Sequence, residues 1–422
     1  MEAFAGVSST SDRRVRSAPR SQGRLRLLEV GLSWPPETFV MLKLRYLAES
    51  GVDVLVGSFP APEMLAPEPA GIKVQTLPGL GSGRRALGRF ARDLMRLDGI
   101  SGRAVLSTLP WRLPLRLWRL YLHLVRARAD VLHFEWLSVA TRCLPLLRVW
   151  DGPIVISCRG SELPTGEPLS NQSPPSVLRA VFARADAVHV VSEAKRDQAV
   201  AQGLDPSKAS LIRTGVDAQF FRPPTTARAD TSRFSVVTVG WLRWLKGYED
   251  ALLAISELAR QDVPVTLDIL GGDPPEEMGE PSQRERILYT VRDLDLEGRV
   301  VLRGHVPPSE VCEHLHRADA LLHASVTEGL PNAVVEAMAC GLPVVATDVG
   351  GTSEALRDGV DGFLVPPRDP EATAAALRSL WRDAGLRAQM GRAGRARVEA
   401  EFTIERQTTK WLELYERVTG VG

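Results

Sequence analysis

The stretch SVTEGLPNAVVEAMACGLPVVATDVGG, residues 325–351, decides the fold. It predicts a turn, a helix from Asn332 to Cys340 and then the buried strand PVVAT, because apolar residues recur at helical spacing and a β-branched run follows. Pro331 suits the first helical position, where its missing N–H costs nothing. Gly341 suits the residue after the helix, where a positive φ is common.

Two carboxylates in this stretch are candidate ligand-binding groups. Glu328 lies in the turn before the helix, and Glu336 lies among apolar helix residues, where burial without a partner would be expensive. The free N–H groups at the helix start form a phosphate seat, which the helix macrodipole strengthens. Together these groups predict a ligand with both phosphate and hydroxyl groups. The alternative is that Glu328 caps the helix and Glu336 lies on an exposed face.

The rest of the chain alternates strand and helix in two series. At 422 residues the chain exceeds one ordinary core. The two series predict an α/β protein with two doubly wound, Rossmann-like domains. A Pro/Thr/Ala/Asp-rich stretch between them predicts an interdomain linker. The predicted parts are a disordered tail (1–23), a first domain (24–215), a linker (216–233), a second domain (234–401) and an amphipathic C-terminal helix (402–422).

The composition is that of a globular protein in a reducing compartment. Hydrophobic residues make up 44% and charged residues 24%, which is ordinary for soluble domains. The four cysteines, Cys143, Cys158, Cys312 and Cys340, have no metal-like or disulfide-like spacing. No apolar run reaches the length of a membrane span without charges, and the tail lacks the apolar core of a secretion signal. We therefore expect a cytoplasmic protein.

The charge distribution is uneven. Residues 1–220 carry 29 Lys and Arg against 20 Asp and Glu, whereas the whole chain has a net charge of +1. The basic half predicts contact with something anionic, such as the inner face of a membrane or a phosphorylated acceptor, unless it only reflects an Arg-rich composition. The basic amphipathic segment 110–129 either lies on an anionic bilayer or covers the sheet. We expect no nucleic-acid partner.

Polar residues follow the strands of the first series. The carboxyl ends of parallel strands are where an open α/β sheet builds its site. A histidine at such a position is often a structural group instead, which leaves His133 open. The first strand is not followed by a Gly-x-Gly-x-x-Gly loop, so we do not expect dinucleotide binding there. The candidates are His133, Glu135, Arg159, Ser161 and Glu162.

The second series begins with a candidate phosphate contact. In TVGWLRWLKGYEDALLAI (238–255), Lys246 and Gly247 stand between a strand and a helix, and Arg243 lies just before them. A lysine at such a junction suits a diphosphate. The alternative is a solvated lysine, although the helix dipole disfavours a cation there, and such local conflicts are typical of functional sites.

Taken together and in order, these motifs resemble those of family 4 glycosyltransferases, which have the GT-B fold. The resemblance implies that the two domains face each other across a cleft and that the C-terminal helix returns to the first domain. The resemblance extends over about Arg24–Val418. Glu328 and Glu336 match the E-x7-E signature, and VGWLRWLKG is similar to the V-G-R-L-x-x-x-K-G phosphate loop. ISCRGSE resembles the H-G-x-D segment, and PPETFV resembles the S-E-T-F loop of a subset that builds surface polysaccharides. VSEAKRDQAVAQG with LIRTGVDAQFFRP resembles the end of the family's first domain.

The resemblance implies a retaining transfer of a sugar from a nucleotide-diphosphate sugar to a saccharide or lipid-linked saccharide in cell-surface polysaccharide biosynthesis. It implies no cofactor and no metal. Glu328 would contact donor sugar hydroxyls, Glu336 the ribose, and Lys246 the leaving diphosphate. The amides of Gly329, Leu330 and Asn332 would face the sugar and the diphosphate. The nucleobase would lie beside Gly304, His305 and Val306, and the acceptor beside Glu37, Thr38, His133, Glu135 and Glu162.

Three residues depart from the family pattern. Trp241 stands in place of Arg, which either removes a phosphate contact or moves it to Arg243, and Thr214 stands in place of Asn. Arg159, the third catalytic candidate, stands in place of a His near the sugar. Two other functions stay open: a non-catalytic GT-B partner subunit, and a nucleotide-sugar epimerase or hydrolase. Asp293 and Asp295 are interpreted as surface acids rather than metal ligands.

Overall fold

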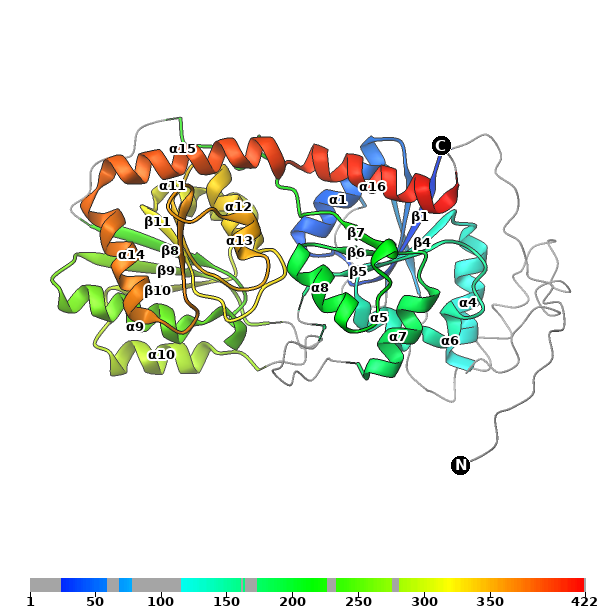
Figure 1. The fold of residues 1–422 in the computed structure, drawn as a ribbon, viewed down its shortest axis with the longest axis horizontal. Coiled ribbons are helices and arrows are strands. Elements are labelled where there is room, and N and C mark those ends of the chain that lie inside the picture. The colour runs from blue at the N-terminus through cyan, green and yellow to red at the C-terminus, as the bar shows by residue number, and fades with distance from the viewer. Residues whose placement is uncertain are drawn as a thin grey trace, which may run out of the picture.

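Two parallel β-sheets, each covered by helices, form the two lobes that lie side by side in Figure 1. The prediction of two doubly wound α/β domains is confirmed. The predicted tail (1–23) and residues 226–232 of the predicted linker lie outside the described residues. The structure is a computed structural model that describes residues 24–58, 68–77, 115–160, 162–163, 173–225, 233–274 and 281–420.

The first sheet has the strand order β3-β2-β1-β4-β5-β6-β7, and its neighbouring strands all run parallel. Because both faces are covered, its central strands are mostly apolar, although buried polar residues such as Glu29, His133 and His189 interrupt them. Leu28 and Val30 point into one apolar layer, and Leu27 points into the other. The strands are β1 (Arg26–Leu32), β2 (Asp53–Ser58), β3 (Ile72–Thr76), β4 (Val131–Phe134), β5 (Ile154–Cys158), β6 (Ala187–Val190) and β7 (Ala209–Leu211). The helices are α1 (Thr38–Glu49), α4 (Leu115–Ala127), α5 (Leu137–Arg142), α6 (Leu144–Leu147), α7 (Pro175–Arg184) and α8 (Glu193–Ala201).

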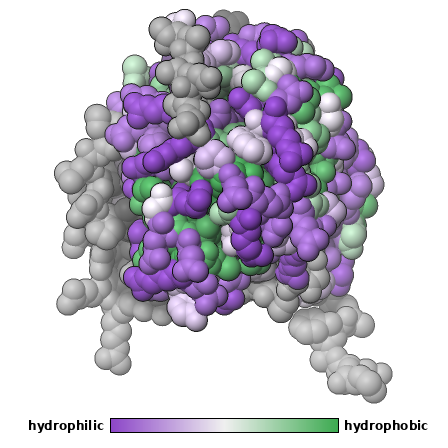
Figure 2. All heavy atoms as spheres, turned by 90° about the vertical axis from the view of Figure 1, so that its left-hand side faces the viewer, coloured by the Kyte–Doolittle hydropathy of each residue, from purple (hydrophilic) through white to green (hydrophobic). Residues whose placement is uncertain are grey.

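The second sheet has the order β10-β9-β8-β11-β12-β13 and is also parallel throughout. Figure 2 shows the free end of this lobe, whose surface is mostly hydrophilic with small apolar patches. The strands are β8 (Phe234–Val239), β9 (Val265–Leu270), β10 (Val300–Gly304), β11 (Ala320–His323), β12 (Val344–Thr347) and β13 (Gly362–Val365). The helices are α9 (Tyr248–Arg260), α10 (Arg284–Asp293), α11 (Pro308–Arg317), α12 (Asn332–Ala339), α13 (Thr352–Ala355), α14 (Pro370–Arg382) and α15 (Ala384–Glu401).

Helix α12 begins at Asn332, as the sequence predicts, but Pro331 does not occupy its first position. Pro331 has φ −78° and ψ 105°, which is extended backbone, so it precedes the helix instead of opening it. Its carbonyl oxygen accepts hydrogen bonds from the N–H groups of Val334 and Val335 at 3.2 and 3.3 Å. The other end agrees with the prediction, since Gly341 has φ 71°.

The chain crosses between the lobes twice at one place. Val216, after the first domain, forms a parallel bridge with Thr403, after α15. The N–H of Val216 donates to Phe402 at 2.8 Å, and the N–H of Ile404 donates back to Val216 at 3.0 Å. A Cβ atom on Gly215 would lie 2.6 Å from the Thr403 carbonyl oxygen, so only glycine permits this approach.

Helix α16 (Ile404–Thr419) continues from α15 in the second lobe and packs on α1 and β4 of the first, as the red helix in Figure 1 shows. Trp411 and Tyr415 are fully buried there. They share an apolar layer with Val40 and Leu44 of α1. The first lobe therefore completes one face of its core with residues from the far end of the sequence.

The basic segment 110–129 contains α4, and its residues 110–114 lie outside the described part. Four leucines of α4 are buried in the core of the first lobe, which favours the alternative in which this helix covers the sheet. They are Leu117, Leu120, Leu122 and Leu124. In the part of the chain that the structure describes, no helix is long and apolar enough to cross a membrane.

Replacing Trp411 tests how far α16 stabilises the first lobe. We expect Trp411→Ala to lower the free energy of unfolding by about 3–5 kcal/mol, because it leaves a cavity between α1 and the sheet. Urea denaturation followed by circular dichroism measures this change. Tyr289→Ala is the control, because Tyr289 is 68% exposed, and its effect should stay within about 0.5 kcal/mol. Equal effects of the two changes would contradict the packing role.

Candidate active site

The site is built where β8 and β11 end side by side in the second sheet. Lys246 follows β8 and Glu328 follows β11, and these two strands are paired. The carboxyl ends of neighbouring parallel strands lie at the same edge, which brings the two side chains together. The Nζ atom of Lys246 lies 2.6 Å from Oε1 of Glu328. Both side chains keep some exposure, 22% for Lys246 and 12% for Glu328.

Two further residues hold the carboxylate of Glu328. Ser325 Oγ donates to Oε1 at 2.8 Å, and His323 Nε2 lies 3.0 Å from the same oxygen. Burial by itself raises the pKa of Glu328, but Lys246 and His323 outweigh burial and hold the pKa below its ordinary value. His323 and Ser325 are not among the site residues predicted from the sequence. The signal that could have found them is their position at the carboxyl end of β11.

The two lobes meet at the turn before α12. A Cβ atom on Gly329 would lie 1.9 Å from the carbonyl oxygen of Arg159 in the first lobe, so the backbones touch here. Glu354 of the second lobe accepts hydrogen bonds from the Ala194 N–H at 3.1 Å and from Arg213 at 2.8 Å. The predicted donor-binding turn and the predicted catalytic Arg159 are thus brought together.

Arg159 is buried with part of its guanidinium unused. Its Nε lies 2.6 Å from Oε1 of Glu135, and its Cζ lies 5.3 Å from the centre of the Phe39 ring. Its Nη2 is buried and has no hydrogen-bond partner among the described residues. A buried donor without an acceptor is costly and is found at sites that await a ligand.

Glu37 and Thr38 lie at the start of α1, on the first-lobe side of the site. Burial raises the pKa of Glu37, and the positive charges of Arg159, Arg243 and Lys246 act against it. Glu37 therefore lies within electrostatic range of cations from both lobes. Thr38 is exposed.

Glu336 lies on α12 with its side chain half-buried. No hydrogen bond or ion pair of its carboxylate involves a described residue. Burial and the neighbouring Cys312 thiol raise the pKa of Glu336 to about 7. Near neutral pH this carboxyl group is therefore divided between its charged and neutral forms.

The predicted nucleobase border contains an aromatic pair. Trp241 and His305 are stacked, with 6.0 Å between ring centroids and 15° between planes. The backbone turns at Gly304, with φ 75°, and Val306 packs against the core of the second lobe. Trp241 therefore presents a flat apolar surface where the family has an arginine. The sequence did not predict this apolar surface; it is evident only from the stacking of Trp241 on His305.

The structure favours a structural role for His133 and Glu135. Both have zero exposed area. Lys43 Nζ lies 2.6 Å from Glu135 and 2.6 Å from Glu29, and His133 Nδ1 lies 2.9 Å from both Glu29 and the Tyr415 hydroxyl. These groups contact one another inside the first lobe and expose no surface to an acceptor, although Oε2 of Glu29 and Oε1 of Glu135 have no hydrogen-bond partner among the described residues.

Glu162, the last predicted acceptor residue, is also nearly buried. Its Oε1 accepts a hydrogen bond from the Ser138 N–H at 2.9 Å, whereas its Oε2 has no partner among the described residues. Burial raises the pKa of this carboxyl group. Ser161 lies outside the described residues.

Two clusters among the described residues have the composition of metal sites. In the first, Glu29, His133 and Glu135 bring their ligand atoms within 4.8 Å of one another. The ammonium of Lys43 lies 2.6 Å from each carboxylate, and the guanidinium of Arg159 lies 2.6 Å from that of Glu135. These two cations balance the two carboxylates, so the cluster offers a metal ion no free charge. The second cluster, Cys312, His316 and Cys340, lies outside the site described here.

Comparisons with known proteins agree with this arrangement. Residues 36–220 match the family model described as Glycosyltransferase Family 4, and residues 225–397 match that described as Glycosyl transferases group 1. The chain is 31% identical over 284 residues to a protein of Escherichia coli (strain K12) named for colanic acid biosynthesis, the glycosyltransferase WcaL, with 65% of this chain and 67% of that one covered. It is 29% identical over 296 residues to glycogen synthase of Mycobacterium tuberculosis (strain ATCC 25618 / H37Rv), with 68% and 69% covered.

A solved structure has the same fold. The crystal structure of Anabaena Alr3699/HepE in complex with UDP-glucose superimposes with a TM-score of 0.68 at 18% identity, over 94% of this chain and all of that one. Two doubly wound lobes that meet at a basic, hydroxyl-lined turn define a GT-B transferase. The chain belongs to the family 4 glycosyltransferases.

The depressed pKa of Glu328 predicts how pH affects stability. Because the folded-state pKa lies below the unfolded one, the charged carboxylate stabilises the fold at neutral pH, and this contribution is lost as the pH falls below about 4.5. We expect Glu328→Gln to lower the melting temperature at pH 7 and to differ progressively less from the wild type as the pH falls from about 4.5 toward about 2. Thermal unfolding across this pH range measures the difference. Glu416→Gln, at an exposed position, should follow the wild type, and a constant gap for Glu328→Gln would refute the ion-pair account.

Proposed function

We propose that this glycosyltransferase moves a sugar from a nucleoside-diphosphate sugar to a saccharide or lipid-linked saccharide, with retention of configuration, in the synthesis of a surface polysaccharide. The observation that carries the proposal is the Lys246–Glu328 pair at the start of α12, directly opposite Arg159 of the other lobe. The names of the relatives, which include colanic acid biosynthesis and glycogen synthase, support a glycan product.

The diphosphate of the donor would lie between Lys246 and the start of α12. The N–H groups of Gly329 and Leu330 are buried and donate no hydrogen bond within the described part of the chain. With the N–H of Asn332 they would serve the diphosphate and the sugar, where the helix dipole favours negative charge. Lys246 would neutralise the charge that develops as the diphosphate leaves. Because this cation comes from the protein, we propose that the transfer requires no metal and no cofactor.

Glu328 would have two tasks. It holds the ammonium of Lys246 in place before the donor arrives, which avoids reorganisation during the reaction. Its second oxygen would accept hydrogen bonds from donor sugar hydroxyls. Attack from the same face as the departing diphosphate needs no covalent nucleophile, so alignment of the acceptor supplies the rest of the rate enhancement.

The nucleoside would occupy the side of the site formed by Trp241 and Glu336. The stacked Trp241 and His305 rings support a planar base beside residues 304–306, and UDP is a suitable probe because the Anabaena structure contains UDP-glucose. The Glu336 carboxylate would accept hydrogen bonds from ribose hydroxyls. Arg243, which lies within electrostatic range of Glu37, would supply the phosphate contact that Trp241 cannot.

The acceptor would approach from the first lobe, past Glu37, Thr38 and Arg159. The unused Nη2 of Arg159 would donate a hydrogen bond to an oxygen of the acceptor or of the transferred sugar. We also propose that the basic first half of the chain contacts an anionic acceptor or an anionic membrane surface.

Replacing Lys246 tests the proposed leaving-group contact. We expect Lys246→Ala to lower kcat about 10²–10³-fold, because it removes one preorganised charge from the departing diphosphate. The donor is first chosen by thermal shift with UDP, GDP, ADP and their common sugars, since a ligand of the folded state raises its stability. Transfer is then measured with that donor and a glycan acceptor. Lys410→Ala, at an exposed position on α16, is the control and should match the wild type.

The same assay separates the proposed function from its two rivals. A non-catalytic partner subunit, which the loss of an arginine at Trp241 favours, would bind nucleotide and turn nothing over. An epimerase or hydrolase would release isomerised donor or free sugar without an acceptor. Near wild-type transfer by Lys246→Ala would also count against the proposal.

The raised pKa of Glu336 predicts a pH-dependent donor affinity. If the charged carboxylate binds the ribose, a proton competes with the donor, and affinity should fall about tenfold per pH unit below pH 7. Calorimetry with a nucleotide sugar measures this, since a nucleotide sugar lacks the terminal phosphate ionisation of a free diphosphate. Glu336→Gln should bind more weakly at pH 8 and show no such slope. A slope that persists in this variant would assign the proton to another group.

A further inference from the structure

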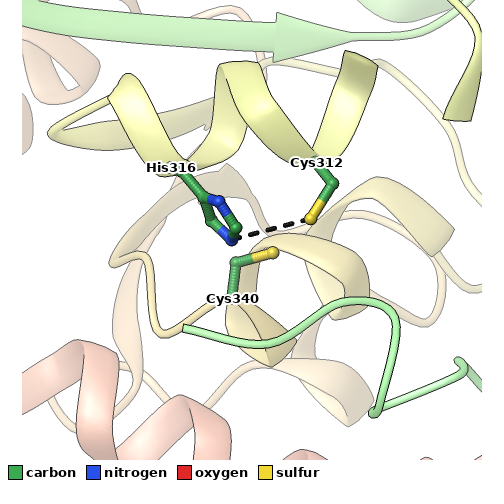
Figure 3. Close-up of side chains that lie close together, drawn as sticks. All are labelled: Cys312, His316 and Cys340. Carbon is green, nitrogen blue, oxygen red and sulfur yellow. Dashed lines mark hydrogen bonds between the residues drawn. The ribbon is translucent and has the colours of Figure 1, made fainter. Parts of the chain in front are cut away.

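Three potential metal ligands meet behind the candidate active site. Cys312 and His316 lie one turn apart on α11, and Cys340 ends α12. Figure 3 shows the three side chains pointing toward one another. Their ligand atoms all lie within 4.8 Å of one another, and the Sγ atom of Cys312 is 3.6 Å from Nε2 of His316. The spacing of the cysteines along the sequence is not metal-like, because the third ligand, Cys340, comes from a different helix.

The geometry suits a tetrahedral thiophilic ion. Zinc binds cysteine sulfur at about 2.3 Å and histidine nitrogen at about 2.0–2.1 Å, so sulfur and nitrogen ligands of one tetrahedron lie about 3.6 Å apart. The observed separation of Cys312 and His316 already has this value. Both thiols are buried, with 8% of Cys312 and 4% of Cys340 exposed. Two thiolates and one divalent cation sum to zero charge, which limits the cost of burial.

Backbone carbonyl groups of the linker accept hydrogen bonds from two of these three side chains. The Nε2 of His316 is 2.7 Å from the carbonyl oxygen of Arg222, and the thiol of Cys312 is 3.6 Å from that of Phe220. A metal would displace the protons of these donors, as is usual when thiols and imidazole become ligands. The three ligand atoms lie close enough to one another to share a single ion.

We propose that Cys312, His316 and Cys340 bind one zinc ion, with water in the fourth position. The ion would fix α11 to α12 beside residues 220–222, which follow the crossing between the lobes at Val216. Cys340 lies one helical turn after Glu336, so the ion would also brace the helix that starts at the candidate active site. This proposal does not depend on the sugar or the acceptor of the transferase.

Metal analysis of the full chain tests the site. After removal of any affinity tag and dialysis against a weak chelator, we expect one zinc per chain by mass spectrometry. Cobalt in place of zinc should give a thiolate-to-metal charge-transfer band. Zinc should also protect two of the four thiols from alkylation, and peptide mapping should identify them as Cys312 and Cys340.

Matched variants connect the signal to these side chains. His316→Asn and Cys340→Ser should each weaken zinc binding about tenfold or more and remove the increase in melting temperature that zinc produces. His314→Asn, on the same helix, and Cys143→Ala, in the first lobe, are the controls and should bind like the wild type. Because His316 is only half-buried, its variant should remain folded, which circular dichroism verifies.

Three results would overturn the proposal. One is wild-type protein that holds no zinc and gives no cobalt charge-transfer band. Another is zinc that binds equally well to His316→Asn and Cys340→Ser. The third is a disulfide between Cys312 and Cys340 that forms in air and excludes the metal, which would assign the pair to thiol oxidation instead.

Discussion

The constraint on which the rest of the structure depends is the double crossing at Val216 and Thr403. Two backbone hydrogen bonds join the only described segments that pass between the lobes. The backbone of Thr403 and Ile404 lies so close to Gly215 that a side chain would not fit there. Since both crossings lie at one point, relative motion of the lobes must pivot there. The contact between Gly329 and Arg159, where the lobes meet at the candidate site, lies away from this pivot, so rotation there would open or close the site.

Two lysines that each pair with a glutamate show how the same pairing can be structural in one lobe and functional in the other. Lys43 lies between Glu29 and Glu135, and neither it nor its partners have appreciable exposure. Lys246 is bonded to Glu328 at the same distance, but both side chains of that pair reach solvent. A fully enclosed pair fixes the fold, whereas a partly open one can exchange a protein carboxylate for a ligand phosphate.

The fold could be predicted from the sequence because its strands and helices are strongly periodic, and β12 lies within the predicted strand PVVAT. The meeting of Lys246 and Glu328 followed from the resemblance and from the rule that parallel strands end at one edge. The inward direction of His133 and Glu135 could not be predicted, because position at a strand end does not fix which groups cover it. The approach of Cys340 to Cys312 depends on how two helices pack, which leaves no regular spacing in the sequence.

The crossing of α16 has a consequence for biosynthesis. During translation, the first lobe emerges with Glu29, Lys43 and His133 facing an uncovered side of its sheet, because Trp411 and Tyr415 do not yet exist. The charged network is completed only after the whole second lobe has left the ribosome. Large chains usually fold domain by domain, but the first lobe cannot complete its core in this way. The helix that covers this face of its sheet, α16, follows the second lobe in the sequence.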